Sequence, residues 1–492
     1  MARVLSIDAG TSGVTALVIS EDARVVARGY REFPQHFPRP GWVEHDAEQI
    51  WDATVAAARE TLDAAGIAAR DVAAIGITNQ RETTVLWDRS TLEPLHHAIV
   101  WQDRRTAARC DEIRDHEPMV RSKTGLVVDA YFSATKLEWL LANVEGARAA
   151  AVNGRLAFGT IDTWLIAKLT RGATHATDYS NAGRTMLYDI YKQDWDPELL
   201  DLFGIPRSVL PEVRPSSGRF GTAELFGARI PVSGVAGDQQ AALFGQACFE
   251  PGMTKNTYGT GSFVLMNTGA TAPAPPKGLL VTLAWGLGGT VTYALEGAIF
   301  ITGAAIQWLR DGLGIIAQAS ETGPLAASVP DTGGVYFVPA MTGLGSPYWD
   351  PYARGAIVGI TRGTTRAHIA RAAIEAMAYQ TRDVVEAMQR EAGVTVAELR
   401  VDGGASVMDL LCRFQADQLG VTVRRSAVAE TTALGAAFLA GLAEGVWSST
   451  AEMADAWHAD ATFEPEGDRA TADALHAEWL RAVERARDWA RG

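Results

Sequence analysis

Four segments of the chain are rich in small residues and contain groups that could bind a phosphate. In the first, Asp8, Gly10, Thr11, Ser12 and Gly13 lie in a turn between two runs of apolar and β-branched residues. Small residues let backbone N–H groups close around an anion, and a carboxylate on the same turn could hold a hydrated magnesium ion. An ordinary glycine-rich hairpin turn is the alternative, and the residues alone leave both open.

The other three segments also follow predicted strands. GVAGDQQAALFG (234–245) opens a helix at Asp238, a carboxylate that could reach a site or simply cap the helix. In YGTGSF (258–263), Thr260 could donate to a phosphate. LRVDGGAS (399–406) ends a strand at two glycines, which would let the backbone approach a nucleotide closely.

A second set of residues is suited to a polyhydroxy ligand. Arg81 and Glu82 are adjacent in a predicted turn, Trp101 lies at a predicted strand end, and Tyr131 lies farther along the chain. An adjacent arginine and glutamate can donate to and accept from hydroxyl groups, and aromatic faces can cover a C–H surface. A surface ion pair beside core aromatics is the alternative.

Several familiar nucleotide and metal sites are excluded by the sequence. No lysine follows a glycine, so the Walker A loop is absent, and no HExxH motif occurs. Gly312, Gly314 and Ala317 fit a relaxed dinucleotide-binding pattern. They do not open a helix after a strand, and we interpret them as a helix end.

The elements that must position these residues alternate between strands and helices, which is typical of an α/β protein. A helix with Asp46 and Gly66 as caps is predicted, and two others carry apolar stripes. These three helices are predicted over 46–66, 366–391 and 468–491. The strand-turn-strand pattern of 4–20 recurs at 256–269, which suggests that the two halves are structural repeats.

Charge and composition limit the partners and the compartment. The 492 residues include 44 basic and 58 acidic ones, for a net charge of −14, whereas nucleic acids and anionic membranes attract a positive surface. Asp8 interrupts the apolar stretch of any signal peptide, and the weakly charged segment 255–310 is interpreted as buried strands and a helix rather than a membrane span. Cys110, Cys248 and Cys412 form no CxxC pair, so we expect no zinc ribbon or disulfide framework and a cytoplasmic location.

A series of longer stretches in a fixed order matches one enzyme family. The stretches are GWVEHD (41–46), AIGITNQRETT (74–84), FGTIDTWLI (158–166), GDQQAALFGQ (237–246), KNTYGTG (255–261), YALEGA (293–298), PYWDPYARGA (347–356) and TALGAAFLAGLA (432–443). Two longer signatures accompany them, YFSATKLEWLLAN (131–143) and a second running from Gly355 through Gly359 and His368 to Glu375. On these motifs the chain resembles the FGGY carbohydrate kinases over essentially its full length, and most closely those that phosphorylate glycerol.

The resemblance implies a fold and a reaction. The fold would be α/β, with two actin/hexokinase-like (ribonuclease H-like) domains whose mixed sheets are flanked by helices. The domains would cover residues 1–250 and 251–492, with the active site in the cleft between them. The reaction would be ATP-dependent phosphorylation of glycerol to sn-glycerol 3-phosphate by direct in-line transfer, with Asp238 as the base and Mg²⁺ as the metal.

The resemblance also implies roles for particular residues. The glycerol site would consist of Arg81, Glu82, Trp101, Tyr131, Asp238, Gln239 and Phe263. Asp8 and Asp238 would face magnesium, partly through water. The nucleotide would be held by Thr11, Ser12, Gly13 and Thr260 at its phosphates, and by Gly303, Gln307 and Gly404 elsewhere.

Some positions depart from the family pattern. Thr15 stands where many of these kinases have an arginine that contacts the nucleotide phosphates, and Met408 stands where an asparagine is expected, so we expect altered ATP affinity. The segment RFGTAELFGARIP (219–231) is interpreted as a loop, and it is shorter than the glycine-rich loop that binds a sugar bisphosphate inhibitor in some relatives. It also lacks the histidine that other relatives phosphorylate, and we predict neither control.

Two other functions are compatible with the residues. A kinase of the same fold could act on another small polyol or triose, such as dihydroxyacetone or a tetritol. A non-catalytic binding or filament-forming protein could use the same fold, although the presence of Asp8, Asp238 and the Arg81–Glu82 pair argues against it. By analogy with its relatives, the protein is expected to be a homodimer or homotetramer.

Overall fold

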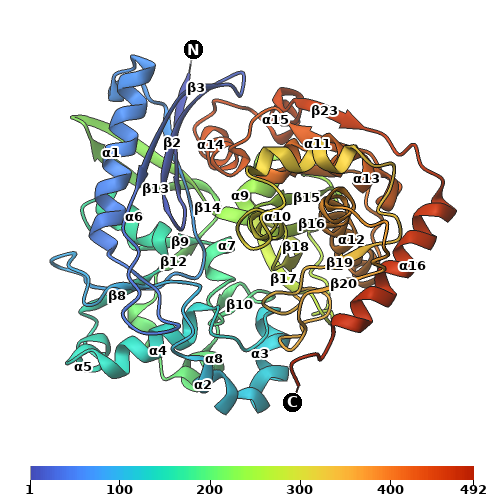
Figure 1. Ribbon diagram of the computed structural model, residues 1–492. Coiled ribbons are helices and arrows are strands. Elements are labelled where there is room, and N and C mark those ends of the chain that lie inside the picture. The colour runs from blue at the N-terminus through green and yellow to red at the C-terminus, as the bar shows by residue number, and fades with distance from the viewer. Residues whose placement is uncertain (1, 492) are drawn as a thin grey trace.

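The structure is a computed structural model that describes residues 2–491 (Figure 1). It contains two large sheets, one in each half of the chain, which lie side by side with the blue and green N-terminal half on the left. The α/β architecture predicted from the sequence is confirmed.

The N-terminal sheet has six strands in the order β13-β14-β5-β1-β2-β3. Their bounds are β1 Arg3–Ala9, β2 Gly13–Ser20, β3 Val25–Glu32, β5 Ala74–Asn79, β13 Ser217–Leu225 and β14 Ala228–Gly237. The first three strands are antiparallel, β1, β5 and β14 are parallel neighbours, and β13 pairs antiparallel at the edge.

The C-terminal sheet has seven strands in the order β17-β18-β16-β15-β21-β22-β23. Their bounds are β15 Thr254–Tyr258, β16 Ser262–Gly269, β17 Leu280–Leu287, β18 Thr290–Ile299, β21 Leu399–Asp402, β22 Val423–Ser426 and β23 Ala459–Phe463. Three antiparallel neighbours, β1-β2-β3 in one half and β15-β16-β18 in the other, are followed on the other side of the first strand by two strands parallel to it, and β17 adds a fourth antiparallel strand in the C-terminal sheet. The predicted repeat is therefore confirmed, with β15 corresponding to β1 and β21 corresponding to β5.

Helices cover both faces of the N-terminal sheet. Ile75 and Ile77 of β5 belong to the core under α1 (Ala47–Ala65) and α6 (Ile161–Leu169). Gly76, between them, faces α14 (Thr431–Ala443), where an added Cβ would lie 2.1 Å from the carbonyl oxygen of Ala436. A helix from the C-terminal half thus completes the N-terminal layer structure.

In the same way, the helix α9 (Asp238–Gly245) of the N-terminal half packs on the C-terminal sheet. It follows β14 of the N-terminal sheet and packs against β15, β16 and β17 of the C-terminal sheet, while α12 (Arg366–Ala392) packs against β16 and β18. The helices α9 and α14 pack directly on each other. A Cβ on Gly435 would lie 1.8 Å from the carbonyl oxygen of Ala241, and one on Gly245 would lie 2.0 Å from that of Thr431. Only glycine permits this backbone approach.

An inserted region between β5 and β13 forms the lower part of Figure 1. Its elements are β6 Val85–Asp88, β7 Ala98–Ile99, α2 Ala107–Glu112, α3 Glu117–Thr124, α4 Ser133–Asn143, α5 Ala147–Val152, β8 Leu156–Gly159, β9 Ala176–Asp178, α7 Tyr179–Ala182, β10 Tyr188–Asp189, β11 Asp194–Trp195, α8 Pro197–Phe203 and β12 Glu212–Arg214. Leu137 and Phe158 of this region share one core with Val264 and Leu295 of the C-terminal sheet. The insert therefore ties the two halves together.

The remaining elements complete the two halves. They are β4 Glu44–His45, α10 Gly303–Asp311, α11 Thr322–Ala327, β19 Tyr336–Val338, β20 Ala356–Val358, α13 Asp409–Leu419, α15 Thr450–Ala456 and α16 Arg469–Ala486. No helix within residues 2–491 has the length and apolar character needed to cross a lipid bilayer.

Most predicted helices are confirmed, but two segments differ from expectation. Asp46 and Gly66 cap α1 as predicted. The terminal helix ends at Ala486 rather than 491, because Asp488 turns out of it and donates its backbone N–H to Asp350. Residues 219–231 are not a loop but a hairpin of β13 and β14, with Phe226 and Gly227 at positive φ as a two-residue turn requires.

Candidate active site

The carboxyl ends of three parallel strands meet at one edge of the N-terminal sheet. Asn79 of β5 lies opposite the last residue of both β1 and β14. Asp8 near the end of β1, Arg81 just after β5 and Asp238 just after β14 are therefore brought together. In open α/β sheets, ligands bind beyond the carboxyl ends of strands in this way.

The turn between β1 and β2 stands at the same edge. Gly10 donates its N–H to the carbonyl of Gly13 at 3.0 Å, and Ser12 at the tip is exposed. Trp101 Nε1 donates to Thr11 Oγ1 at 3.0 Å, which joins the turn to the inserted region. The predicted phosphate-binding turn is thus held next to a predicted glycerol-site residue.

Asp238 is not the cap of its helix. Gly237 occupies the N-cap position and Asp238 is the first helical residue. Its Oδ1 accepts from the backbone N–H of Gln239 at 2.7 Å and lies 3.1 Å from Arg81 Nε. The capping interpretation is therefore wrong, and the carboxylate projects toward the arginine instead.

Burial changes the protonation behaviour of both aspartates. It raises the pKa of Asp238, an effect that the positive charge of Arg81 partly offsets. It also raises the pKa of Asp8 to about 7, with the negative charges of Asp238 and Glu430 adding to the effect. Both carboxylates are stronger bases than the ordinary aspartate assumed from sequence.

Arg81 is the centre of the site. Its side chain is 2% exposed, and Nη1 and Nη2 donate to the two carboxylate oxygens of Glu296 at 2.6 and 3.2 Å. Nη1 also donates to Gln240 at 3.3 Å, and Nη2 to the hydroxyl of Tyr131 at 3.4 Å. The guanidinium carbon lies 6.0 Å from the centre of the Phe263 ring.

Glu82 is fixed by its backbone and by a second arginine. It adopts the left-handed conformation with φ of 60°, which is uncommon for any residue other than glycine. Its Oε1 accepts from Arg184 Nε at 2.6 Å, and both side chains are almost fully buried. The surface ion-pair interpretation of Arg81 and Glu82 is wrong, because both residues lie inside the protein.

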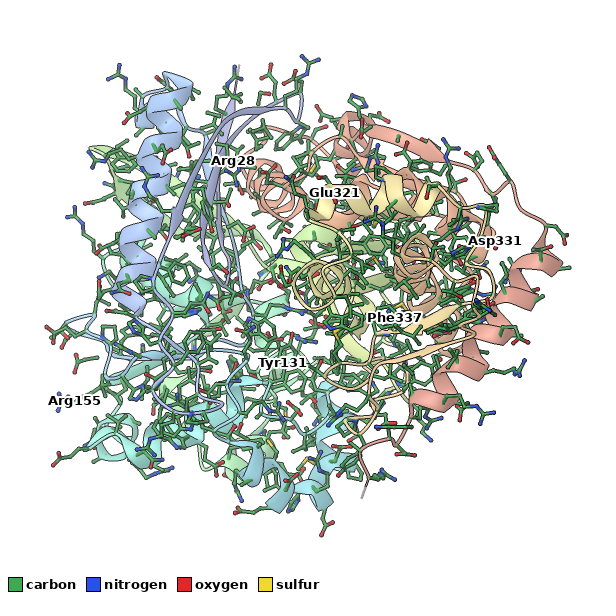
Figure 2. All side chains as sticks on the ribbon, viewed as in Figure 1. Arg28, Tyr131, Arg155, Glu321, Asp331 and Phe337 are labelled. Atoms are coloured by element: carbon green, nitrogen blue, oxygen red, sulfur yellow. The ribbon has the colours of Figure 1, made fainter. Side chains whose placement is uncertain are left out.

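Aromatic side chains form one wall of the site. The rings of Trp101 and Tyr131 meet edge to face with centroids 5.6 Å apart. Figure 2 labels Tyr131 near the middle of the molecule, where the inserted region meets the C-terminal half. Such a wall can cover the carbon surface of a small ligand while Arg81 and Glu82 bind its polar groups.

Four predicted nucleotide-site residues lie at the corresponding edge of the C-terminal sheet. Gly303 and Ala304, at the start of α10, donate their N–H groups to the carbonyls of Gly259 and Thr260, each at 3.0 Å. Gln307 is exposed one turn farther along α10. Gly404 follows β21, whose neighbour β15 leads to Thr260.

Gln239 lies in the site but its side chain is directed toward Lys255. Lys255 is fully buried, and its Nζ donates to Gln239 Oε1 and to Thr257 Oγ1 at 2.5 and 3.0 Å. Burial lowers the pKa of Lys255 to about 8. Lys255 thus links β15 of the C-terminal half to the first turn of α9.

Sequence reasoning missed several buried partners of these residues, namely Arg184, Gln240, Lys255 and Glu296. Of these, Glu296 could have been found from the sequence. Apart from its ends, segment 255–310 contains only two charged residues, Lys277 and Glu296. A lone carboxylate in a buried strand requires a positive partner.

Two surface hollows have volumes of about 600 and 500 Å³. The first lies over the outer side of α1 and β3, and the second lies between the β2–β3 turn and residues 426–430 and 456–458. Neither contains a predicted site residue. The site is therefore identified by the chemistry of its side chains rather than by the size of a cavity.

The two aspartates fit a hydrated magnesium ion. No group of three or more His, Cys, Asp or Glu side chains in residues 2–491 is arranged to hold a metal. Magnesium, however, keeps several waters and takes only one or two protein carboxylates when substrate phosphates supply the rest. Asp8 and Asp238 provide two such carboxylates, whose mutual repulsion a cation would relieve.

The charge of Asp8 should reduce the stability of the ligand-free protein at neutral pH. Its folded-state pKa of about 7 lies above the ordinary 3.8, so the folded state binds the proton more tightly than the unfolded state. Stability from this group therefore falls as the pH rises from about 4 to about 7 and stays low above that range. We expect Asp8→Asn to raise the melting temperature at pH 8 by more than at pH 5, as measured by differential scanning fluorimetry. A lower melting temperature at both pH values would contradict this prediction.

Comparison with known proteins places this chain in one class. Residues 3–245 match the N-terminal domain of the FGGY family of carbohydrate kinases, and residues 254–444 match its C-terminal domain. The chain belongs to this family. It is 57% identical to "Glycerol kinase 2" of Thermotoga maritima over 99% of both chains. It is 58% identical to the glycerol kinase of Deinococcus radiodurans over 99% of this chain and 98% of the other.

A solved structure gives the same result. The glycerol kinase of Plasmodium falciparum, determined with ADP, superposes with a TM-score of 0.94 at 35% identity, covering 99% of this chain and 98% of that one. The two-domain fold expected from the resemblance is confirmed.

Proposed function

We propose that the protein phosphorylates glycerol with ATP, forming sn-glycerol 3-phosphate by direct in-line transfer. The observation that carries the proposal is the buried Arg81–Glu82 pair, with Asp238 only 3.1 Å from Arg81. The full-length similarity to glycerol kinases at 57 and 58% identity supports it.

The site is suited to a small polyol. Arg81 can donate to hydroxyl oxygens and the Glu82 carboxylate can accept from them. The edge-to-face pair of Trp101 and Tyr131 and the nearby Phe263 ring would cover the carbon chain and exclude water. Excluding water from this site limits wasteful hydrolysis of ATP.

Asp238 is placed to orient the attacking hydroxyl and to receive its proton. Its raised pKa makes it a better proton acceptor than an ordinary aspartate. Phosphoryl transfer depends mainly on positioning and charge stabilisation, so Asp238 and Arg81 would orient the acceptor, and Asp238 would in addition take up the proton. Closure of the two halves around both substrates would complete the site.

The nucleotide would lie between the two strand-end edges. Thr11, Ser12 and Gly13 would face its phosphates from the N-terminal half, and Thr260 from the C-terminal half. Gly303, Gln307 and Gly404 would contact the rest. Asp8 and Asp238 would hold Mg²⁺, which when bound neutralises phosphate charge. Thr15 lies directly opposite Asp8 in the β1–β2 register. The arginine that many family members have at this position would therefore lie beside the nucleotide phosphates, and Thr15 cannot supply its charge.

Other features of the protein remain predictions. They are the domain boundary at residue 250, a homodimeric or homotetrameric assembly and a cytoplasmic location. The packing of α14 on the N-terminal sheet shows that the two halves depend on each other physically.

A substrate panel tests the proposed function. ADP release would be measured with Mg²⁺ and ATP in the presence of glycerol, dihydroxyacetone, erythritol, xylitol, ribulose or xylulose, and without acceptor. We expect the highest kcat/KM with glycerol. Faster turnover of dihydroxyacetone or erythritol would favour the second candidate substrate class. Activity led by a five-carbon sugar would contradict the proposed fit between the aromatic wall and a three-carbon chain.

A further inference from the structure

Glu296 is a buried carboxylate that connects the two halves of the protein at the active site. It lies in β18 of the C-terminal sheet, and its side chain is 1% exposed. Both of its carboxylate oxygens accept from the guanidinium of Arg81, at 2.6 and 3.2 Å. Arg81 follows β5 of the N-terminal sheet, so this bidentate pair spans the interface between the halves.

Arg184 forms a second link of the same kind. Its side chain is fully buried and follows α7 in the inserted region. Its Nε donates to Glu82 at 2.6 Å, while its Nη2 lies 3.1 Å from Glu296 Oε1. The guanidinium carbon also lies 5.4 Å from the centre of the Tyr131 ring. Arg184 is therefore held between the two carboxylates and against the aromatic wall.

The four side chains form an alternating row of charges, in the order Arg81, Glu296, Arg184 and Glu82. Burial alone would raise the pKa of Glu296, but the positive charges of Arg184 and Arg81 hold it at about 2. Glu296 thus stays ionised at any working pH. Removing one member would leave its neighbours buried with unbalanced charge.

The geometry of Arg81 depends on Glu296 in particular. A guanidinium has five N–H donors in a rigid plane, so a bidentate carboxylate fixes the direction of the whole group. The other acidic partners of Arg81 both lie at its Nε, Asp238 at 3.1 Å and Glu82 at 3.8 Å. Without Glu296, the guanidinium would be free to turn toward Asp238, away from the direction in which a substrate hydroxyl must meet it.

We propose that Glu296 and Arg184 are positioning residues for the substrate. Glu296 orients Arg81 and Arg184 orients Glu82, so that the recognition pair of the N-terminal half is set by a strand of the C-terminal half. This inference rests on the proposed function and deepens it. It makes acceptor binding sensitive to the relative position of the two halves, whereas the predicted nucleotide contacts do not involve these residues.

The test compares Glu296→Gln with a matched control, Glu375→Gln. Glu375 is also buried and paired with an arginine, Arg371, but it lies in α12 and contacts none of the predicted site residues in the described part of the chain. KM for glycerol, KM for ATP and kcat would be measured for both variants. Because a charged hydrogen-bond pair is lost, we expect Glu296→Gln to raise KM for glycerol about tenfold or more. KM for ATP should stay within about twofold of the unmodified value, and Glu375→Gln should leave the ratio of the two KM values unchanged.

A conservative variant keeps the test decisive if Glu296→Gln does not fold. Glu296→Asp keeps the negative charge but moves the carboxylate away from Arg81 by the length of one methylene group. We expect it to raise KM for glycerol by less than Glu296→Gln does. Equal changes in both KM values for Glu296→Gln, or an unchanged KM for glycerol in Glu296→Asp, would overturn the inference. For each variant, the ratio of KM for the acceptor to KM for ATP would be measured with the acceptor that the unmodified enzyme turns over best. A different best acceptor therefore contradicts the proposed function without deciding the role of Glu296.

Discussion

Replacing Asp238 by asparagine is expected to lower kcat about a thousandfold while leaving acceptor binding nearly intact. Asparagine has the same shape, and its Oδ1 can still accept from the Gln239 N–H, which donates to the carboxylate at 2.7 Å, while it keeps its place 3.1 Å from Arg81 Nε. It cannot take a proton from the attacking hydroxyl. The loss should therefore fall on the chemical step.

The measurement is steady-state ADP release, together with the melting temperature with and without glycerol. A ligand that binds only the folded state stabilises it, so the glycerol-induced shift should survive in the variant. Asp468→Asn is a matched control, since Asp468 caps α16 through the N–H of Thr471 and has no contact with the site. A kcat within about tenfold of the unmodified enzyme would mean that Asp238 is not the proton acceptor.

Replacing Gly435 by alanine is expected to damage both stability and catalysis. The new Cβ would lie 1.8 Å from the carbonyl oxygen of Ala241, so α14 and α9 would have to move apart. Overpacking of this kind costs about 3 kcal/mol, of which the better helix propensity of alanine offsets only about 1 kcal/mol. Because α9 begins at Asp238, its displacement also moves the proposed base.

Urea unfolding and kcat would be measured for the Gly435 variant. We expect the free energy of unfolding to fall by about 2 kcal/mol and kcat to fall about a hundredfold, since misplacement of a reacting group by about 1 Å has that effect. Gly363→Ala is the control, because a Cβ there meets only Thr361 Oγ1 at 3.8 Å. Unchanged kcat in a destabilised Gly435→Ala protein would show that α9 does not transmit the displacement to Asp238.

Local sequence signals predicted much of the fold. The strand-turn-strand pattern that opens each of the two repeats depends on residues close together in the chain, and so do the caps of α1. Turn and capping preferences act over the same short range. The motifs also supplied Arg81, Glu82 and Asp238, which the structure brings into one contacting group.

Contacts between distant segments could not be predicted in this way. Whether Asp238 caps its helix or projects from it depends on Arg81, far away in the sequence. The end of α16 depends on Asp350, and the crossing of α14 depends on glycines in two separate segments. Glu296 and Arg184 acquire their roles only when a strand of one half meets the insert of the other.

The packing of α14, a helix of the C-terminal half, on the N-terminal sheet has a consequence for biosynthesis. The face of the N-terminal sheet that α14 covers, including Gly76 and Gly234, has no helix on it until residues 431–443 have been made. At about 5–20 residues per second, translation of 246–430 takes about ten to forty seconds. An N-terminal sheet formed during that time would expose this apolar face, and exposed apolar surface favours aggregation, so the solubility of the first half would depend on completion of the second.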